Sequence, residues 1–416
     1  MKNFAVFTNV ITAAAILLSC TSRNDKNLLP LLLLSQSPKQ WTIMLYLNGD
    51  DCDMQTDYLN TFEDIVNTEV GSTNDVNIVI QLDRYWVPDP RFGGWEIAHR
   101  FYLTPGMAPL EENAIHDWGD GRGGREVDMS DPDTLMDFLS WVERNYPAKQ
   151  YALLAADHGF GWKGLLHDGT SFYNHMMLRE FKEAIDGAKL RIDLLAFNAC
   201  LMQMAEVAYE LHDSPVSFMV GSEMPGSAWP MAAMLQEITN HPLMSADEMG
   251  RMMCDLYVDT NAPYGQVTLS TVDLTRVNEL AEKFNDFVQA LMVSGNSESS
   301  YANAKLKAGE LMAVLENAVV YSKSNNPDAN GLSIYFPDIS TEPPTELYYF
   351  YQPDITRFSS ECGWRNFLDV YHNIMMYPQY PIDPRIFTIR DSMNILDSAD
   401  PNIDLYDFCR RIVESG

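Results

Sequence analysis

Six short and nearly continuous apolar runs, separated by longer amphipathic stretches, constrain the fold of this chain most strongly. The runs are residues 41–48, 76–82, 151–156, 192–197, 217–220 and 332–336. An apolar run without alternation is typical of a strand that is covered on both faces. Apolar residues at helical spacing predict helices over residues 54–67, 132–145, 176–188, 201–212, 246–260, 276–294 and 302–323. This order predicts an α/β fold with a mostly parallel central sheet and helices on both sides.

The residues that directly follow these runs are where chemistry is expected, because ligands of such sheets bind beyond the carboxyl ends of the strands. The run 151–156 is followed by Asp157 and His158, and the run 192–197 leads through Asn198 to Cys200. An imidazole beside a thiol keeps the nucleophile ionised and later protonates a leaving amine. The two residues therefore predict nucleophilic catalysis, provided that their strands are neighbours.

Cys200 ends a predicted strand and opens the predicted helix 201–212. A cysteine at a helix N-terminus lies at the positive end of the helix dipole, which favours the thiolate. The alternative is a buried structural cysteine. A histidine at a corresponding strand end favours the catalytic interpretation.

His158 lies in the glycine-containing segment DHGFGW of residues 157–162. Gly159 allows the backbone to approach a substrate closely, and its N–H group is a candidate oxyanion donor. Asp157 either orients the histidine or faces away from it.

Longer stretches around both residues resemble the clostripain family of cysteine peptidases. YALLAADHGFGW (residues 151–162) resembles the family's histidine motif, and DLLAFNACLM (residues 193–202) resembles its cysteine motif. Residues 41–51, 126–141 and 221–225 are similar to further family segments, in the family's order, over about residues 41–375.

The resemblance implies a caspase-like α/β/α sandwich and a Cys–His dyad. Cys200 is then the nucleophile of a thioester mechanism and His158 its general base. The backbone N–H groups of Gly159 and Cys200 are expected to form the oxyanion hole. The implied activity is that of a cysteine endopeptidase acting on protein or peptide substrates.

One departure from the family pattern concerns the residue before the cleaved bond (P1). Family members that cleave after Arg or Lys have an acidic residue two positions before the nucleophile, where this chain has Asn198. They have another in the loop after the following strand, where Ser227 or Ala228 stands here. A buried cation without a carboxylate is poorly paired. Glu223 is the candidate replacement in the substrate pocket, and the P1 preference stays open.

Two other functions stay open as well. One is a catalytically inactive surface lipoprotein that uses the same fold for binding, and the other is a transamidating or asparaginyl-type enzyme. The presence of both Cys200 and His158 favours the peptidase.

The N-terminal residues are typical of an export signal. Lys2 precedes a short apolar stretch, residues 11–18, and Leu17-Leu18-Ser19-Cys20 resembles a lipoprotein cleavage site. We therefore expect residues 1–20 to be a signal peptide, residues 21–40 a tether, residues 41–375 the peptidase domain and residues 376–416 a C-terminal extension. The expected location is outside the cytoplasm, as a lipoprotein anchored to the outer or cell membrane through Cys20, or otherwise as a secreted protein.

The net charge of −30 bears on partners and cofactors. A charge of this sign repels nucleic acid, so no nucleic-acid partner is expected, and we expect a monomer. The acidic run Asp50, Asp51, Asp53 and Asp57 is a possible calcium site, although it does not follow the EF-hand pattern. Helix capping by Asp51 or Asp53 is the alternative. The other histidines lack metal-binding spacing, so no metal site is assigned.

Overall fold

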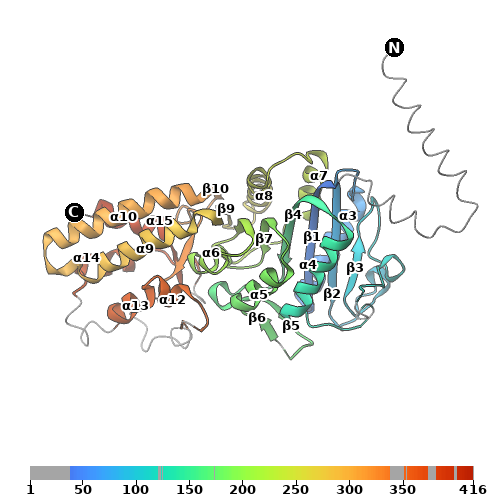
Figure 1. The fold of residues 1–416 in the computed structure, drawn as a ribbon, viewed down its shortest axis with the longest axis horizontal. Helices are drawn as coiled ribbons and strands as arrows, with labels where there is room; N and C mark the ends of the chain where they lie inside the picture. Colours follow the sequence, from blue (N-terminus) through green and yellow to red (C-terminus); the bar gives the residue numbers. More distant parts are fainter. Residues whose placement is uncertain are drawn as a thin grey trace, which may run out of the picture. The chain divides into compact units, whose positions relative to one another are not determined.

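An eight-stranded sheet forms the centre of the fold (Figure 1). The computed structural model describes residues 38–119, 123, 125–172, 174–337, 351–352, 354–372, 381–397 and 401–415. The strand order is β10-β9-β8-β7-β4-β1-β2-β3. In chain order these strands are β1 (Lys39–Gly49), β2 (Val76–Arg84), β3 (His99–Tyr102), β4 (Ala148–Ala156), β7 (Ile192–Asn198), β8 (Val216–Gly221), β9 (Thr268–Asp273) and β10 (Val319–Ser324).

The middle of the sheet is parallel and its edges are antiparallel. Strands β8, β7, β4, β1 and β2 pair in parallel, whereas β3, β9 and β10 pair antiparallel to their neighbours. Two smaller sheets pair β5 (Leu165–Asp168) with β6 (Asn174–Met176) and β11 (Ser333–Tyr335) with β12 (Asn402–Asp404). Since parallel strands share one direction, the carboxyl ends of the five central strands lie at one edge of the sheet.

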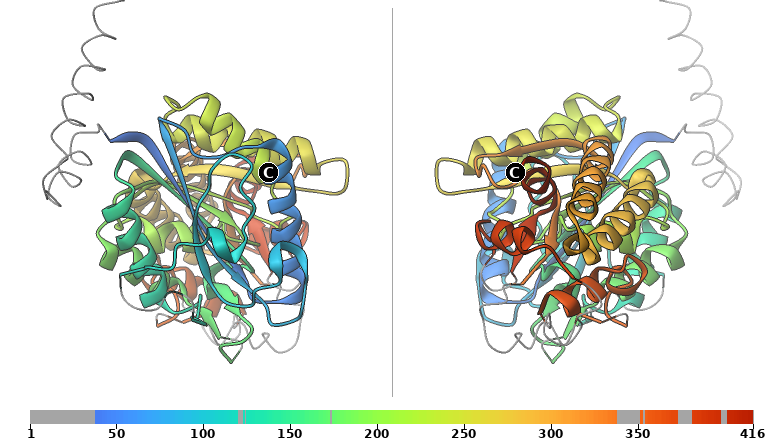
Figure 2. Two further views of the ribbon diagram at one scale, coloured as in Figure 1. Left: turned by 90° about the vertical axis from the view of Figure 1, so that its right-hand side faces the viewer. Right: turned by 90° about the vertical axis from the view of Figure 1, so that its left-hand side faces the viewer.

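Helices cover both faces of the sheet (Figure 2). They are α3 (Cys52–Thr68), α4 (Pro132–Asn145), α5 (Leu178–Ala188), α6 (Ala205–Leu211), α7 (Met231–Asn240), α8 (Ala246–Asn261), α9 (Val277–Met292), α10 (Glu298–Ala318), α12 (Phe358–Glu361), α13 (Trp364–His372), α14 (Pro384–Asp391) and α15 (Leu405–Glu414).

Two hydrophobic cores follow from the alternation of side chains along the strands. In β1, Met44 and Tyr46 point into the core shared with α4, α5 and the C-terminal helices, whereas Ile43 and Leu45 point into the core shared with α3, α7 and α8. Every residue of β2 is buried. Burial on both faces is the reason why these strands are nearly continuous in apolar residues, and it confirms the predicted α/β/α sandwich.

All six predicted strands are present, but one lies elsewhere than expected. The run 332–336 contributes β11, which pairs with β12 outside the central sheet. The edge strands β3, β9 and β10 were not predicted, and residues 319–323, predicted as the end of a helix, belong to β10. Helix α4 has the predicted bounds because Asp131 caps it through the Asp133 N–H and Pro132 occupies its first turn.

The structure describes little of the N-terminal segment predicted from the sequence but most of the C-terminal one. The expected signal peptide, Cys20 and almost all of the expected tether lie outside the described residues, and β1 already begins at Lys39. Of the described helices, none is long and apolar enough to cross a bilayer. In the predicted extension 376–416, which showed little periodicity, α14, β12 and α15 form, and α15 packs against α10. Lys39 onward is one compact unit.

Candidate active site

Cys200 and His158 follow neighbouring strands of the central sheet. Strands β4 and β7 pair in parallel with Ala156 opposite Asn198, so the chain leaves the two strands at the same level. His158 is the second residue after Ala156 and Cys200 the second after Asn198. The strand neighbourhood on which the catalytic interpretation depends is therefore present, and both residues line the same cavity.

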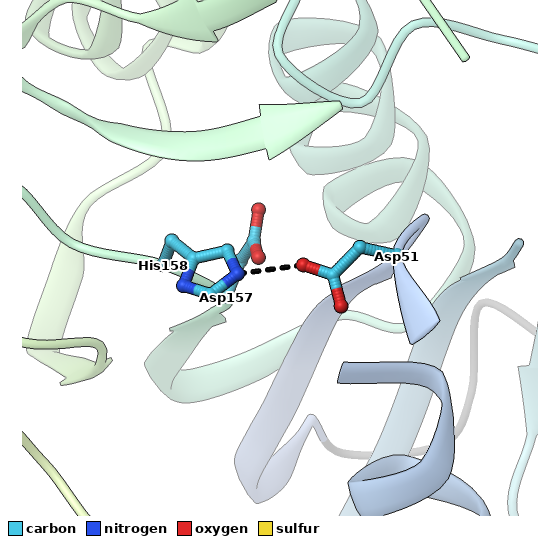
Figure 3. Close-up of side chains that lie close together, drawn as sticks. All are labelled: Asp51, Asp157 and His158. Carbon is cyan, nitrogen blue, oxygen red and sulfur yellow. Dashed lines mark hydrogen bonds and ion pairs between the residues drawn. The ribbon is translucent and has the colours of Figure 1, made fainter. Parts of the chain in front are cut away.

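Asp51 binds the imidazole of His158 (Figure 3). Its Oδ2 lies 2.6 Å from His158 Nε2, and the side chains are 22% and 38% exposed. The same carboxylate caps α3, because its Oδ1 accepts hydrogen bonds from the N–H groups of Asp53 and Met54 at 2.8 and 2.7 Å. The capping role was one of two sequence interpretations, but the contact with His158 was missed. Its only sequence signal was an acid just after the carboxyl end of β1, the strand that pairs with β4.

The contact with Asp51 changes the protonation of both groups. Its hydrogen bond to His158 raises the pKa of the imidazole, against the opposing effect of burial. Burial would raise the pKa of Asp51, but its hydrogen bonds with His158 and with Met54 N–H outweigh that effect and lower it. With Nε2 engaged by Asp51, His158 Nδ1 remains for proton exchange with a thiol or a substrate.

Asp157 does not make the contact that orients His158. Its Oδ2 accepts hydrogen bonds from Asn48 Nδ2 at 2.8 Å and from the backbone N–H of His167 at 2.5 Å. It is almost fully buried, and burial raises its pKa well above the usual range. Asp157 therefore does not hydrogen-bond to the ring of His158, although one of its oxygen atoms lies within 4.8 Å of the ligand atoms of His158 and Asp51.

Cys200 does not lie at a helix N-terminus, contrary to the sequence prediction. Helix α6 begins at Ala205, and the stretch between β7 and α6 is a turn in which Leu201 adopts a left-handed conformation (φ 64°). The effect of a helix dipole falls off beyond the first turn, so it does not reach Cys200. Burial instead raises the pKa of the Cys200 thiol, partly offset by a hydrogen bond from Gly226 N–H to Sγ at 3.1 Å.

Gly159 packs directly against the backbone of Cys200. A Cβ atom at this position would lie 2.2 Å from the Cys200 carbonyl oxygen and 2.8 Å from its nitrogen. Only glycine allows this approach. Within the described part of the chain, the N–H groups of Gly159 and Cys200 make no hydrogen bond. Both are thus available to an incoming oxygen atom.

A cavity of about 100 Å³ opens beside the two residues. It is lined by side chains from α3, from the ends of β4 and β7 and from the segment after β8: Met54, Asp57, Tyr58, Thr61, Asp157, His158, Asn198, Ala199, Cys200, Gly226, Ser227, Ala228 and Trp229. Ser227 N–H donates to Tyr257 Oη at 2.8 Å, and the Ala228 carbonyl accepts from Asn261 Nδ2 at 3.1 Å. Helix α8, which carries Tyr257 and Asn261, thereby holds one wall in place.

Asp57 supplies this cavity with a carboxylate that the sequence analysis did not assign to it. The residue is exposed on α3, and among the described residues it has neither a hydrogen bond nor an ion pair through its side chain. Partial burial, with the charges of Asp53 and Asp51, raises its pKa. Asn198 does line the cavity, as expected.

The expectation that Glu223 lies in the substrate pocket is wrong. It is fully buried, and its Oε2 accepts hydrogen bonds from Gly331 N–H at 2.8 Å and from Thr268 Oγ1 at 3.2 Å. Burial and the nearby Asp404 raise its pKa well above the usual range. Its carboxyl group therefore packs in the interior and does not face the cavity.

The acidic run proposed for calcium does not converge on one point. Asp50 Oδ2 accepts a hydrogen bond from Thr170 N–H at 2.6 Å, Asp51 binds His158, Asp57 lines the cavity, and Asp53 is exposed. These side chains leave β1 and α3 in different directions. No common calcium site can be built from all four.

Comparison with known proteins agrees with this arrangement. Residues 45–377 match the sequence pattern of the Clostripain family. Clostripain of Hathewaya histolytica is 27% identical over 214 residues, which are 46% of this chain and 38% of that protein. This chain thus aligns with well under half of its curated relative.

Solved structures show the same fold at low sequence identity. A secreted C11 cysteine protease from Bacteroides thetaiotaomicron, bound to an irreversible peptide inhibitor, superimposes with a TM-score of 0.60 at 17% identity, covering 78% of this chain and 99% of that one. An inactive zymogen C11 protease from Parabacteroides distasonis superimposes with a TM-score of 0.54 at 18% identity, covering 79% and 99%.

Proposed function

Because the chain belongs to the clostripain family, we propose that it is an exported cysteine endopeptidase in which Cys200 is the nucleophile and His158 the general base. One observation carries this proposal. Cys200 and His158 leave adjacent parallel strands at the same level and line one cavity. A nucleophile and its base need this kind of common placement.

The proposed reaction begins with transfer of the Cys200 proton to His158. Sγ attacks the carbonyl carbon of the scissile bond, and the negative oxygen accepts hydrogen bonds from Gly159 N–H and Cys200 N–H. When the tetrahedral intermediate collapses, the C–N bond breaks and the leaving amine takes the proton from the imidazolium. Water then attacks the thioester with His158 as base, which releases the acid and restores the thiol.

Asp51 is a positioning residue in this scheme. Its hydrogen bond to Nε2 holds the ring and stabilises the imidazolium that forms during the reaction. Because burial raises the pKa of the Cys200 thiol, the thiolate depends on the nearby imidazolium and on the Gly226 N–H group.

For P1 specificity we propose a basic side chain, lysine or arginine. The acid of the family pattern is replaced by Asn198 and Glu223 faces the interior, but Asp57 brings a carboxylate to the same cavity from α3. Met54, Tyr58 and Trp229 offer apolar surface to the aliphatic part of such a side chain. Asp157 also lines the cavity, but its Oδ2 is engaged by Asn48 and His167.

Cleavage of a P1-diverse peptide library by the purified chain tests this function, with Cys200→Ala beside it. Activity that is lost in Cys200→Ala and concentrated on lysine or arginine at P1 is the expected result. Equal activity in both proteins would refute the assigned nucleophile. Absence of activity in both, with reductant present, would favour the inactive lipoprotein that binds its targets through the same surface. Lipid attachment at Cys20 is a separate proposal, tested by mass spectrometry of the membrane fraction.

A further inference from the structure

Three side chains of types that can bind a metal lie close together at the ends of β1 and β4, although the sequence spacing of histidines gave no sign of a metal site. One ligand atom each from Asp51, Asp157 and His158 lies within 4.8 Å of the other two. In Figure 3 both carboxylates are drawn beside the same edge of the imidazole, and a dashed line joins the ring to Asp51. Each of the three residues directly follows or closely follows a central strand, so the group is held by rigid elements.

One oxygen atom of Asp157 is buried without a hydrogen-bond donor among the described residues, which leaves it free to bind a cation. The residue is 4% exposed, and its Oδ2 is occupied by Asn48 and His167. Its Oδ1 is buried and has no hydrogen-bond partner in the described part of the chain. A buried carboxylate oxygen without a donor is costly, and a cation beside it would remove that cost.

We propose that Asp51, Asp157 and His158 form an inhibitory Zn²⁺ site. The ligands are His158 Nε2, one oxygen of Asp51 and Oδ1 of Asp157, and water fills the fourth position. Two carboxylates and a neutral imidazole balance the charge of the ion, and nitrogen with oxygen is a ligand set that Zn²⁺ accepts.

The movement required of Asp51 and His158 is small. Zinc ligands at about 2.0–2.1 Å from the ion lie about 3.3 Å from one another in a tetrahedron. Asp51 Oδ2 and His158 Nε2, now 2.6 Å apart, would therefore separate by about 0.7 Å, which rotation of two partly exposed side chains permits. The exposed edges of these two residues also give the ion a route in.

Inhibition follows from the chemistry of the ring. Zn²⁺ takes the lone pair of Nε2 and displaces the proton that Asp51 and His158 share. The neutral imidazole then carries its remaining proton on Nδ1 and has no basic nitrogen for the Cys200 proton. Binding of the ion is independent of peptidase activity, whereas inhibition rests on the proposed function.

Direct binding to a thiol-free protein tests the site. Zn²⁺ affinity is measured in the Cys200→Ala full chain by competition with a chromogenic chelator, and the ion is located by zinc-edge anomalous scattering from crystals. We expect one ion between the three residues, and an affinity that falls about ten-fold or more in Asp157→Asn on the same background.

Asp193→Asn is the matched control. Asp193 is also a mostly buried aspartate (7% exposed) that accepts a backbone N–H, from Tyr151 at 3.0 Å, but it does not line the cavity. This variant should bind Zn²⁺ as the Cys200→Ala parent does. If Asp157→Asn fails to fold, Asp51→Asn replaces it, with the same expected loss.

An anomalous peak elsewhere, or an affinity unchanged by the loss of Asp157 or Asp51, overturns the proposal. Zn²⁺ binding by the wild type that disappears in Cys200→Ala also overturns it, because the thiolate would then be the ligand. If Zn²⁺ binds as described but the wild type shows no peptidase activity to inhibit, the metal site stands and the proposed function fails.

Discussion

Replacement of Asp57 by asparagine separates the role of this carboxylate from that of the cavity shape. Asparagine has nearly the same size and keeps the surroundings of Met54 and Tyr58, but it carries no charge. If Asp57 pairs with a basic P1 side chain, the substitution should lower kcat/KM only for substrates with a positively charged residue at P1. The quantity to follow is the ratio of kcat/KM for lysine against norleucine at P1 in otherwise identical peptides.

The size of the effect follows from the exposure of the pair. Two unit charges about 4 Å apart interact by ~4 kcal/mol at an effective dielectric constant of about 20, whereas exposed ion pairs contribute only ~0.2–1 kcal/mol. Asp57 is exposed on one side, yet burial is the main reason why its pKa is raised. We therefore expect a loss of ~1–2 kcal/mol, or about 5- to 30-fold in the lysine-to-norleucine ratio.

Asp53→Asn is the matched control for this variant. Asp53 lies one turn earlier on α3, is exposed, and is absent from the cavity lining, although its charge also acts on Asp57. It should change the ratio by less than about two-fold, as long-range charges in solvent are screened. An unchanged lysine-to-norleucine ratio in Asp57→Asn would refute the reasoning. So would a fall in kcat/KM that is as large for the norleucine peptide as for the lysine peptide.

If Asp57 pairs with a lysine at P1, the lysine-to-norleucine ratio should also depend on pH. Only the ionised carboxylate attracts a basic side chain, so the lysine preference is complete above the pKa of Asp57 and is lost as pH falls through it. Because burial and the charges of Asp53 and Asp51 raise that pKa, the loss begins at a higher pH than for a free aspartate. In Asp57→Asn the lysine-to-norleucine ratio should not vary over that range.

Four further substitutions test the remaining parts of the site and the fold. Asp51→Asn keeps a good helix cap but removes the negative charge beside His158, so kcat should fall by about 100-fold or more. The acidic limb of the pH–rate profile should move to lower pH, because the base is no longer held at a raised pKa by Asp51. Gly159→Ala places a Cβ atom 2.2 Å from the Cys200 carbonyl oxygen and should lower kcat by about 100-fold or more, as measured beside the thermal unfolding midpoint. His158→Ala should shift alkylation of Cys200 by iodoacetamide to higher pH, since burial then raises the thiol pKa without an imidazolium to offset it. Gly309→Ala, on α10 with no atom within 4 Å of the new Cβ, should stabilise the fold by ~0.5–1 kcal/mol in denaturant unfolding, and a destabilised variant would show that the helix face is not open.

The central sheet was predictable because its strands are buried on both faces. Such strands need apolar residues at every position, and this leaves a signal that a single sequence shows. The edge strand β10 (VVYSKS) is only partly buried along its length and carries polar residues, so its sequence resembles the preceding helix as much as a strand. Partner and register, such as the pairing of β11 with β12, depend on contacts between residues far apart in the chain.

In the candidate site, the common placement of Cys200 and His158 was predictable, but the residues that contact them were not. Cys200 and His158 follow strands whose order can be inferred, whereas the helix start at Ala205 removed the expected dipole effect on the thiol. Leu201 explains the difference: with φ at 64° it turns the chain directly after Cys200, and a helix cannot begin there. A non-glycine residue in this conformation leaves no mark in the sequence.

The acidic run shows most clearly why the remaining roles could not be derived from the sequence. Asp50, Asp51 and Asp57 are close in the chain, and their proximity suggested one shared site. The chain turns from β1 into α3 between Asp50 and Cys52, so that Asp50 bonds to Thr170 N–H, Asp51 caps the helix and meets His158, and Asp57 reaches the cavity nearly two turns later. The turn thus directs the three carboxylates to three different places, and two of them, Asp51 and Asp57, belong to the candidate active site. Helix α3 and its N-cap therefore carry both residues to which we assign new roles, Asp51 beside the proposed base and Asp57 at the proposed P1 pocket. Under this proposal, the activity depends on the position of α3 relative to β4 and β7.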